Sequence, residues 1–243
     1  MKILTTARKT LITYGSALTL GLTAALASAP AAAAEESFTW KVQSHWPGSS
    51  SSYEDSLVRL KTILEERTDG RLELKLYEAG SLFKAKEIFN AVSRGILEMG
   101  TISPAYAQDK ITLAGIASGL PFAFRNVWEA AYFHQGLGFE QMLRDEAAKH
   151  NVYWATDKVY PTEMVVKQPI DSWEDFTKLK IRSSGALQSF LTDAGAAASY
   201  IPGSELYSAL DSGIVDGAHW GASQGAFSMG LYEVAKYHVQ PAL

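Results

Sequence analysis

Two segments near the start of the chain alternate apolar and polar side chains. They are residues 38–44 (FTWKVQS) and 72–77 (LELKLY). Alternation with a period of two is typical of a strand that buries one face. The pattern therefore predicts strands over both segments, and we predict a third strand over 96–102.

Helical spacing separates these strands. Apolar residues recur every three or four positions in 53–68 and again in 84–94. A strand-helix-strand-helix-strand order predicts a parallel sheet with right-handed crossovers. Ligands of such sheets bind beyond the carboxyl ends of the strands, which places His45, Trp46 and the segment 103–106 at the candidate site.

The second half of the chain combines the same two patterns. A helical pattern over 127–150 is interrupted by Gly136 and Gly138, and the Val-, Tyr- and Trp-rich segment 151–160 predicts a strand that continues across 163–166. A strand of this length could serve two domains. Further on we expect a strand ending at Arg182, strands over 197–202 and 216–220, and helices over 173–176, 186–194, 205–211 (with Ser204 as N-cap) and 224–229. No obvious element closes the chain at its end.

The first 34 residues have the three parts of a secretory signal peptide. Three basic residues precede an apolar run over 11–26, small residues follow, and cleavage is expected after Ala29 or Ala34. The run is too short and too rich in Ala, Thr and Gly for a membrane span, although an uncleaved anchor is the alternative. The pattern predicts a periplasmic protein.

The composition is acidic and lacks cysteine. Removal of residues 1–34 takes away three basic and no acidic residues, so the formal charge moves from −4 to −7. This acidity, without a basic stripe, argues against binding of nucleic acid. No disulfide, thiolate metal site or cysteine nucleophile is available. Stability must therefore come from burial of an apolar core.

The segment 179–185 (LKIRSSG) carries the strongest candidate for ligand binding. A short strand ends in Arg182, and Ser-Ser-Gly leads into a helical pattern. The guanidinium offers a planar fork of donors that fits a carboxylate, and the helix N-terminus adds N–H groups. This combination predicts a small organic anion as the ligand. The alternative is that Arg182 pairs with an acidic neighbour such as Asp175.

The order of the motifs resembles that of a known family. The strand end Lys180-Ile181-Arg182 is followed by a helix and then by the segment 203–217 (GSELYSALDSGIVDG). This order is similar to that in the solute-binding proteins of tripartite ATP-independent periplasmic (TRAP) transporters. The similarity runs from about Phe38 to the last residue.

The resemblance implies an α/β fold: a two-lobed periplasmic binding protein with a ligand cleft between the lobes and strands crossing between them. Residues 35–159 would form mainly the first lobe and 160–243 mainly the second, with the C-terminal part of the fold missing, because members of the family continue past the segment that matches 232–237. It also implies a receptor, not an enzyme, that needs no cofactor. Such a receptor closes on a small organic acid held by Arg182 and delivers it to the membrane subunits of the TRAP transporter.

Trp220 and Trp46 each follow a predicted strand and are candidate walls of the cleft. The resemblance implies a wall for Trp220, and the alternative is a core side chain; Trp46 could instead cap its sheet. His45 and His219 directly precede them and join the candidate site. In some members of the family an acidic residue stands before the tryptophan and helps to hold a cation. Here that residue is His219, which argues against a metal-bridged mode.

Glu163 lies where members of the family often place a polar ligand contact. A buried carboxylate there is costly unless it meets a hydroxyl or ammonium group. With Arg182 opposite, Glu163 would suit a hydroxy- or amino-substituted carboxylate better than a dicarboxylate. The alternative is a Glu163 that is solvated or paired with Lys158.

Catalytic and metal-binding motifs are absent from the sequence. None of the five histidines lies in a recognisable motif with a nucleophile, and we expect His134 and His150 at the surface or at helix ends. We therefore expect no catalytic residue and no metal site. A secreted or periplasmic enzyme with a dispersed site, or a ligand-sensing protein, stays as the alternative function.

Overall fold

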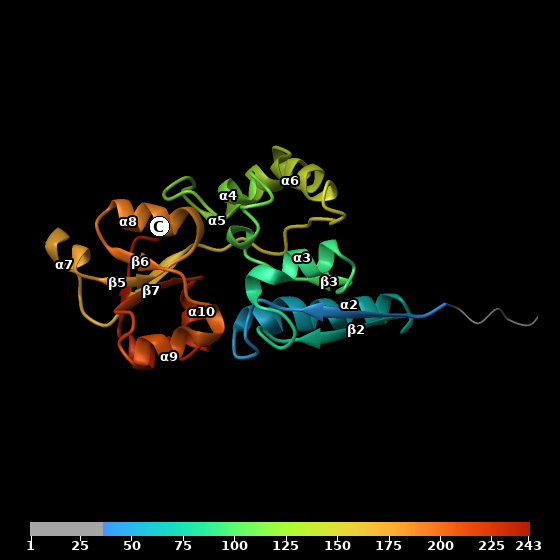
Figure 1. The fold of residues 1–243 in the computed structure, drawn as a ribbon, viewed down its shortest axis with the longest axis horizontal. Helices are drawn as coiled ribbons and strands as arrows, with labels where there is room; N and C mark the ends of the chain where they lie inside the picture. The colour runs from blue at the N-terminus through green and yellow to red at the C-terminus, as the bar shows by residue number, and fades with distance from the viewer. Residues whose placement is uncertain (1–35) are drawn as a thin grey trace, which may run out of the picture. The chain divides into compact units, whose positions relative to one another are not determined.

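The first sheet is parallel and has the strand order β2-β1-β3 (Figure 1). In the computed structural model, which describes residues 36–243, β1 spans Phe38–Gln43, β2 spans Leu72–Tyr77 and β3 spans Met99–Gly100. β1 pairs with β2 from Phe38 opposite Leu72 to Gln43 opposite Tyr77. The predicted parallel sheet is therefore confirmed. The predicted signal peptide lies outside the described residues.

Helices follow the strands of this sheet as predicted. After β1 come a π-helical turn, η1 (Tyr53–Val58), and α2 (Arg59–Arg67); after β2 come η2 (Ala85–Glu87) and α3 (Ile88–Ser93). Val42, Leu57 and Leu74 form one buried cluster between the sheet and its helices. Apolar residues at helical spacing thus bury the faces that the sequence indicated.

A helical region follows the first sheet. It consists of η3 (Pro104–Tyr106), α4 (Ala114–Ala117), α5 (Val127–Ala131), η4 (Tyr132–Gly136) and α6 (Phe139–Ala148). The Asn126 side chain accepts hydrogen bonds from two backbone N–H groups at the start of α5. Gly138 has a left-handed backbone (φ 82°) where η4 passes into α6, so the predicted interruption of this helix is confirmed.

The second sheet is mixed and has the order β6-β5-β7-β4-β8. Its strands are β4 (Glu163–Val166), β5 (Lys180–Arg182), β6 (Ala197–Ser199), β7 (Gly217–Trp220) and β8 (Tyr237–Val239). β5 runs parallel to β6 and β7, whereas β4 runs antiparallel to β7 and β8. β5 is a central strand, so its last residue, Arg182, is held from both sides.

The helices of the second sheet enclose two buried clusters. They are α7 (Trp173–Thr177), α8 (Gly185–Asp193), η5 (Gly203–Glu205), α9 (Leu206–Asp211), α10 (Ser223–Ser228) and α11 (Leu231–Val234). One cluster centres on Leu206 and Leu210, and the other on Ile181 and Leu191. We refer to residues 37–150 as the first lobe, 163–243 as the second lobe and 151–162 as the connecting segment.

The structure corrects four predictions of local structure. The strand predicted over 96–102 shrinks to Met99–Gly100, because β1 offers it only two paired positions. Ser204 is not an N-cap; it lies inside the turn η5, which precedes α9. The chain closes with β8, which the sequence did not reveal. The fourth correction concerns the connecting segment.

The strand predicted over 151–160 does not form; the strand begins only at Glu163. Side-chain exposure in 151–158 alternates from one residue to the next, as in an extended chain, whereas the prediction rested on the Val, Tyr and Trp content of the segment. None of the strands between residues 36 and 243 is hydrogen-bonded to it, and a strand requires such a ladder. The connection between the lobes is therefore made by an extended segment and not by a strand.

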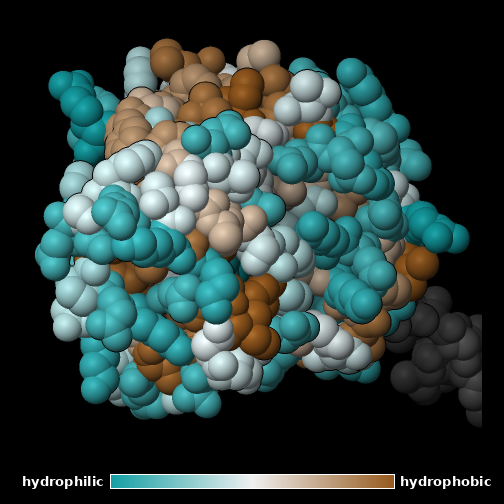
Figure 2. Space-filling model, turned by 60° about the vertical axis from the view of Figure 1, so that its left-hand side comes forward, coloured by the Kyte–Doolittle hydropathy of each residue, from teal (hydrophilic) through white to brown (hydrophobic). Residues whose placement is uncertain are grey.

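The surface of the described chain carries many large apolar side chains. Figure 2 shows apolar residues gathered in several places on one face. Trp128 and Phe227 are 81% and 66% exposed. No helix between residues 36 and 243 has the length and apolarity that crossing a membrane requires.

Candidate functional site

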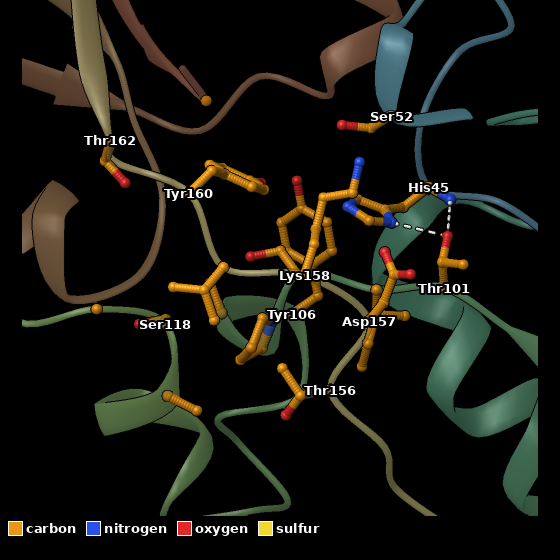
Figure 3. Close-up of a pocket in the computed structure, with 18 of the residues that line it drawn as sticks. His45, Ser52, Thr101, Tyr106, Ser118, Thr156, Asp157, Lys158, Tyr160 and Thr162 are labelled. Carbon is orange, nitrogen blue, oxygen red and sulfur yellow. Dashed lines mark hydrogen bonds between the residues drawn. The ribbon is translucent and has the colours of Figure 1, made fainter. Parts of the chain in front are cut away.

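A cleft of about 1200 Å³ is lined by residues of both lobes and of the connecting segment (Figure 3). His45, Trp46 and Tyr106 contribute from the first lobe, and Arg182, His219 and Trp220 from the second. The residues that the sequence placed at strand ends thus meet in one cavity. The connecting segment adds Lys158 and Tyr160.

Arg182 is the buried cation of the cleft. Its side chain is fixed from two directions: Nε donates to the carbonyl of Ile201 at 2.9 Å and Nη1 donates to the carbonyl of His219 at 3.0 Å. The residue is only 2% exposed, yet no carboxylate among residues 36–243 pairs with it. Asp175, the predicted alternative partner, bonds instead to Ser172. A buried guanidinium without an anion is costly, which suits a site that an anionic ligand completes.

Trp220 lies against Arg182 in the second lobe. The centre of the guanidinium is 5.3 Å from the centroid of the indole ring, within the range of a cation–π interaction. The ring rests on the backbone at Gly203, where an added Cβ would lie 2.4 Å from the indole Cη2. Trp220 is half-buried and lines the cleft, so its ring packs partly against the protein and partly faces the cavity.

His219 is a neutral side chain beside Arg182. Burial, together with the positive charge of Arg182, holds the pKa of His219 well below its usual value. Its Nδ1 lies 2.6 Å from the Ser183 hydroxyl. The imidazole therefore offers hydrogen bonding to the cleft without adding a second positive charge next to the guanidinium.

His45 occupies the corresponding place at the end of β1 in the first lobe. Burial lowers its pKa to about 3, against a smaller opposing effect of hydrogen bonding to the backbone of Thr101. Nδ1 lies 3.0 Å from the Thr101 hydroxyl, a contact drawn in Figure 3. The ring centroids of Trp46 and Tyr106 lie 4.3 Å and 5.9 Å from that of His45. These three rings make an aromatic wall on the first-lobe side of the cleft.

Glu163 is placed differently from the other candidates. It does not line the cleft; its carboxylate accepts hydrogen bonds at 2.8 Å from Ser223, His238 and Gln240. Lys158, the predicted alternative partner, lies instead over the Trp46 ring. Burial raises the pKa of Glu163, but the three hydrogen bonds together outweigh it and hold the pKa below its usual value.

Sequence reasoning missed three contributors to the cleft. Lys158 and Tyr160 come from the connecting segment, where the predicted strand gave no reason to assign them to a ligand. Thr101 orients His45 from the residue after β3, and position at the carboxyl end of a strand is the signal that could have found it. Within the described part of the chain, no three His, Asp or Glu side chains are grouped as a metal site requires.

Two α/β lobes joined by an extended segment, with a cleft lined from both, define the class of two-lobed binding proteins. Within this class, the chain belongs to the bacterial extracellular solute-binding proteins, family 7, whose sequence model matches residues 43–242. The structures that it resembles include TRAP transporter solute-binding proteins, so the resemblance found in the sequence motifs is confirmed.

Relatives of known name support this assignment. A monocarboxylate 2-oxoacid-binding periplasmic protein of Nostoc sp. is 27% identical over 204 residues, which make up 83% of this chain and 56% of that protein. A TRAP solute-binding protein of Bordetella bronchiseptica, with calcium and picolinate in its site, is 26% identical with a TM-score of 0.75, covering 85% of this chain and 62% of that one. A TRAP solute-binding protein of Chromohalobacter salexigens, with bound 2-amino-1-propanol, shares the fold at 19% identity and a TM-score of 0.76. The match covers 85% of this chain and 65% of that one. The chain thus spans a little over half the length of these curated relatives.

Proposed function

We propose that this chain is the ligand-binding part of an extracytoplasmic receptor that captures a small organic carboxylate and delivers it to the membrane subunits of a TRAP transporter. The single observation that carries the proposal is Arg182, a buried cation on the cleft wall whose partners among the described residues are backbone carbonyls. A ligand carboxylate would supply the missing counter-charge. The receptor is not an enzyme, and its work lies in the periplasm after removal of residues 1–34.

Two of the three named relatives agree with an acidic ligand. The Nostoc relative is described as binding monocarboxylate 2-oxoacids, and the Bordetella structure holds picolinate, which is also a carboxylate. In the present chain the neutral state of His219 leaves the positive charge beside Trp220 to Arg182. The ligand carboxylate therefore binds at Arg182.

Contacts between the lobes support a receptor that closes on its ligand. The backbone N–H of Ser51 donates to the Ser228 hydroxyl at 2.9 Å, and the Ser49 hydroxyl lies 3.3 Å from the sulfur of Met229. Each contact joins the segment just before η1 in the first lobe to the C-terminal end of α10, at Ser228 or the following Met229, in the second. A ligand that contacts both lobes would favour this closed arrangement over an open one.

Native mass spectrometry of the purified protein, followed by unfolding to release any bound small molecule, tests the class of ligand. We expect a carboxylic acid at a stoichiometry of one per chain. Incubation of that acid with the protein should return it unchanged, because a receptor has no product. Conversion of the acid would instead support the alternative of an enzyme with a dispersed site.

Arg182→Lys tests the anchor. Lysine keeps the charge but loses the planar fork, so affinity for the released acid should fall by about 1.5–3 kcal/mol, as expected for a charge-assisted contact. Isothermal titration calorimetry measures the loss, and circular dichroism checks that the variant is folded. Arg59→Lys, at an exposed position on α2, is the matched control. Equal affinities of Arg182→Lys and wild type would remove Arg182 from the site.

A further inference from the structure

Tyr200 directly follows β6 in the second lobe, but its ring packs against the first lobe. The Lys86 ammonium of η2 lies 4.0 Å from the centroid of the Tyr200 ring, within the range of a cation–π interaction. The Tyr106 ring of η3 meets the Tyr200 ring edge-on, with 5.7 Å between the centroids and an interplanar angle of 81°. One side chain of the second lobe is thus held by two side chains of the first.

The second lobe offers the Tyr200 ring little packing of its own. Among the described residues, Tyr200 belongs to neither of the two buried clusters of the second lobe, although the next residue, Ile201, packs against one of them. The half-buried ring would therefore lose most of its contacts if the lobes separated. Its burial stabilises the protein only when the two lobes are together.

The acidic residues near Lys86 have other partners. Glu87 accepts a hydrogen bond from the backbone N–H of Lys84 at 3.0 Å, and Asp109 forms an ion pair with Lys110. Within residues 36–243, no carboxylate forms an ion pair with Lys86 itself. The contact of the ammonium with the Tyr200 ring is therefore not replaced by a salt bridge inside the first lobe.

This contact lies beside the ligand cleft and outside it. A separate cavity of about 160 Å³ is lined by Lys86 and Tyr200, and it shares Tyr106 and Ser184 with the cleft. Neither Lys86 nor Tyr200 lines the cleft itself. The pair can therefore stabilise the approach of the lobes without touching an acid that is bound at Arg182.

Tyr106 connects this contact to the wall of the cleft. It is 8% exposed, and Figure 3 shows its side chain among the residues that line the pocket. Its ring lies 5.9 Å from the His45 ring and 5.7 Å from the Tyr200 ring, measured between centroids. Tyr200 thus supports a side chain of the aromatic wall as well as the contact between the lobes.

We infer that Tyr200, held between Lys86 and Tyr106, is a positioning residue that latches the two lobes together from outside the cleft. The inference rests on the proposed function, because it gives this contact a role in a receptor that closes on an acid. Only protein groups take part, so the contact favours the closed arrangement with or without the acid. Where the open form predominates, the contact raises the apparent affinity for the acid by the same factor by which it favours closure.

Distances between the lobes test the latch without any ligand. The chain has no cysteine, so Arg59→Cys on α2 and Asp211→Cys on α9, both at exposed positions, can carry a pair of spin labels. Pulsed electron paramagnetic resonance then measures the ratio of closed to open protein after refolding free of any bound acid. Tyr200→Leu should lower this ratio by about 5- to 50-fold, because the aromatic pair and the cation–π contact are both lost.

A double-mutant cycle separates the latch from a general loss of structure. Lys86→Met should lower the ratio by about 2- to 5-fold in the wild-type background and by less than about 1.5-fold in the Tyr200→Leu background. Tyr200→Phe keeps the ring and should keep most of the closed population. The controls, Lys149→Met and Tyr237→Leu at exposed positions, should leave the ratio unchanged, and thermal unfolding should show that all variants are folded.

Two results would overturn the inference. One is the same distribution of distances in wild type and in Tyr200→Leu, and the other is an equal effect of Lys86→Met in both backgrounds. Because no acid is added, either result leaves the proposed function intact. That function fails separately if native mass spectrometry releases no carboxylic acid.

Discussion

At the scale of single residues, burial decides the charge state of the cleft. Loss of solvation holds the pKa of His45 and of His219 below the usual value for histidine, and Arg182 supplies the buried positive charge of the cleft. The cleft therefore combines fixed positive charge with neutral imidazole rings. This division could not be derived from the sequence, where all three residues are simply basic side chains near strand ends.

Acid should destabilise the protein through His45. Its folded pKa is about 3, whereas an unfolded histidine titrates near 6.5, so the unfolded state binds a proton first as the pH falls. The stabilisation present above pH 6.5 is thus lost progressively below it, by about 2 kcal/mol between pH 7 and pH 5. Chemical denaturation at both pH values measures this loss.

The variant that checks this prediction is His45→Gln. Glutamine does not titrate, and its side-chain carbonyl can still accept a hydrogen bond from the Thr101 hydroxyl. The difference in free energy of unfolding between pH 7 and pH 5 should shrink by about 2 kcal/mol in the variant. An unchanged difference would mean that His45 is not the titrating group.

Glu163 should prove structural. Glu163→Gln puts an amide among three donors, so we expect a loss of about 1–3 kcal/mol of stability at pH 7 and nearly unchanged ligand affinity. Because the folded pKa is lowered, the contribution of Glu163 is present above pH 4.5 and is lost as the pH falls below it. Urea unfolding and calorimetry measure the two effects. A strong loss of affinity with normal stability would return Glu163 to the ligand site.

At the scale of elements, close approach of strands explains a glycine that the sequence pattern treats as ordinary. Gly217 begins β7, and an added Cβ would lie 2.9 Å from the Val165 carbonyl oxygen of β4 and 2.7 Å from Val166 Cγ1. Both neighbours are held in the centre of the second sheet. A side chain there cannot be accommodated without separating the two strands.

Gly217→Ala should therefore destabilise the protein by about 1–3 kcal/mol, as overpacking in a core does. The control is Gly115→Ala, because an added Cβ at Gly115 has no atom within 4 Å and α4 gains a better helix former. Thermal unfolding should show a lower midpoint for the first variant and an equal or higher one for the second. Equal midpoints would show that β4 and β7 separate easily.

The elements themselves were predictable where local pattern and pairing agree. β1, β2, α7 and α8 match their predicted ranges closely, because each has a clear period and a partner that buries its apolar side. The connecting segment has the period of a strand but no paired neighbour, and β8 gains strand structure only because β4 lies beside it. Hydrogen-bonding partners are decided by tertiary structure, which a local pattern does not contain.

At the scale of the whole molecule, the two lobes meet at the N-terminus of α8. Gly185, the first residue of α8, has a left-handed backbone (φ 62°), and an added Cβ would lie 2.8 Å from the Cβ of Ala105 in η3. Only glycine therefore allows the two lobes to approach this closely. The contact lies next to the ligand cleft, because Ala105 also lines it.

Gly185→Ala should weaken ligand binding by hindering this approach, in addition to the cost of left-handed backbone of about 1–2 kcal/mol. Gly70→Ala isolates the second effect, since Gly70 also has a positive φ (76°) but no atom within 4 Å of an added Cβ. We expect both variants to lose stability and only Gly185→Ala to lose affinity for the acid by calorimetry. Equal affinities in the two variants would contradict a role of this contact in closure.

The sequence by itself determined the α/β class, the family, the periods of most elements and the main anion-binding candidate, Arg182. These follow from local order: apolar spacing, turn residues and the position of a side chain at the end of a strand. Only the tertiary structure decided that Arg182 has no carboxylate partner among residues 36–243, that Glu163 turns to His238 and away from the cleft, and that Lys158 enters it. Each of these depends on which distant segments become neighbours, because charge, desolvation and hydrogen bonding act through space and not along the chain.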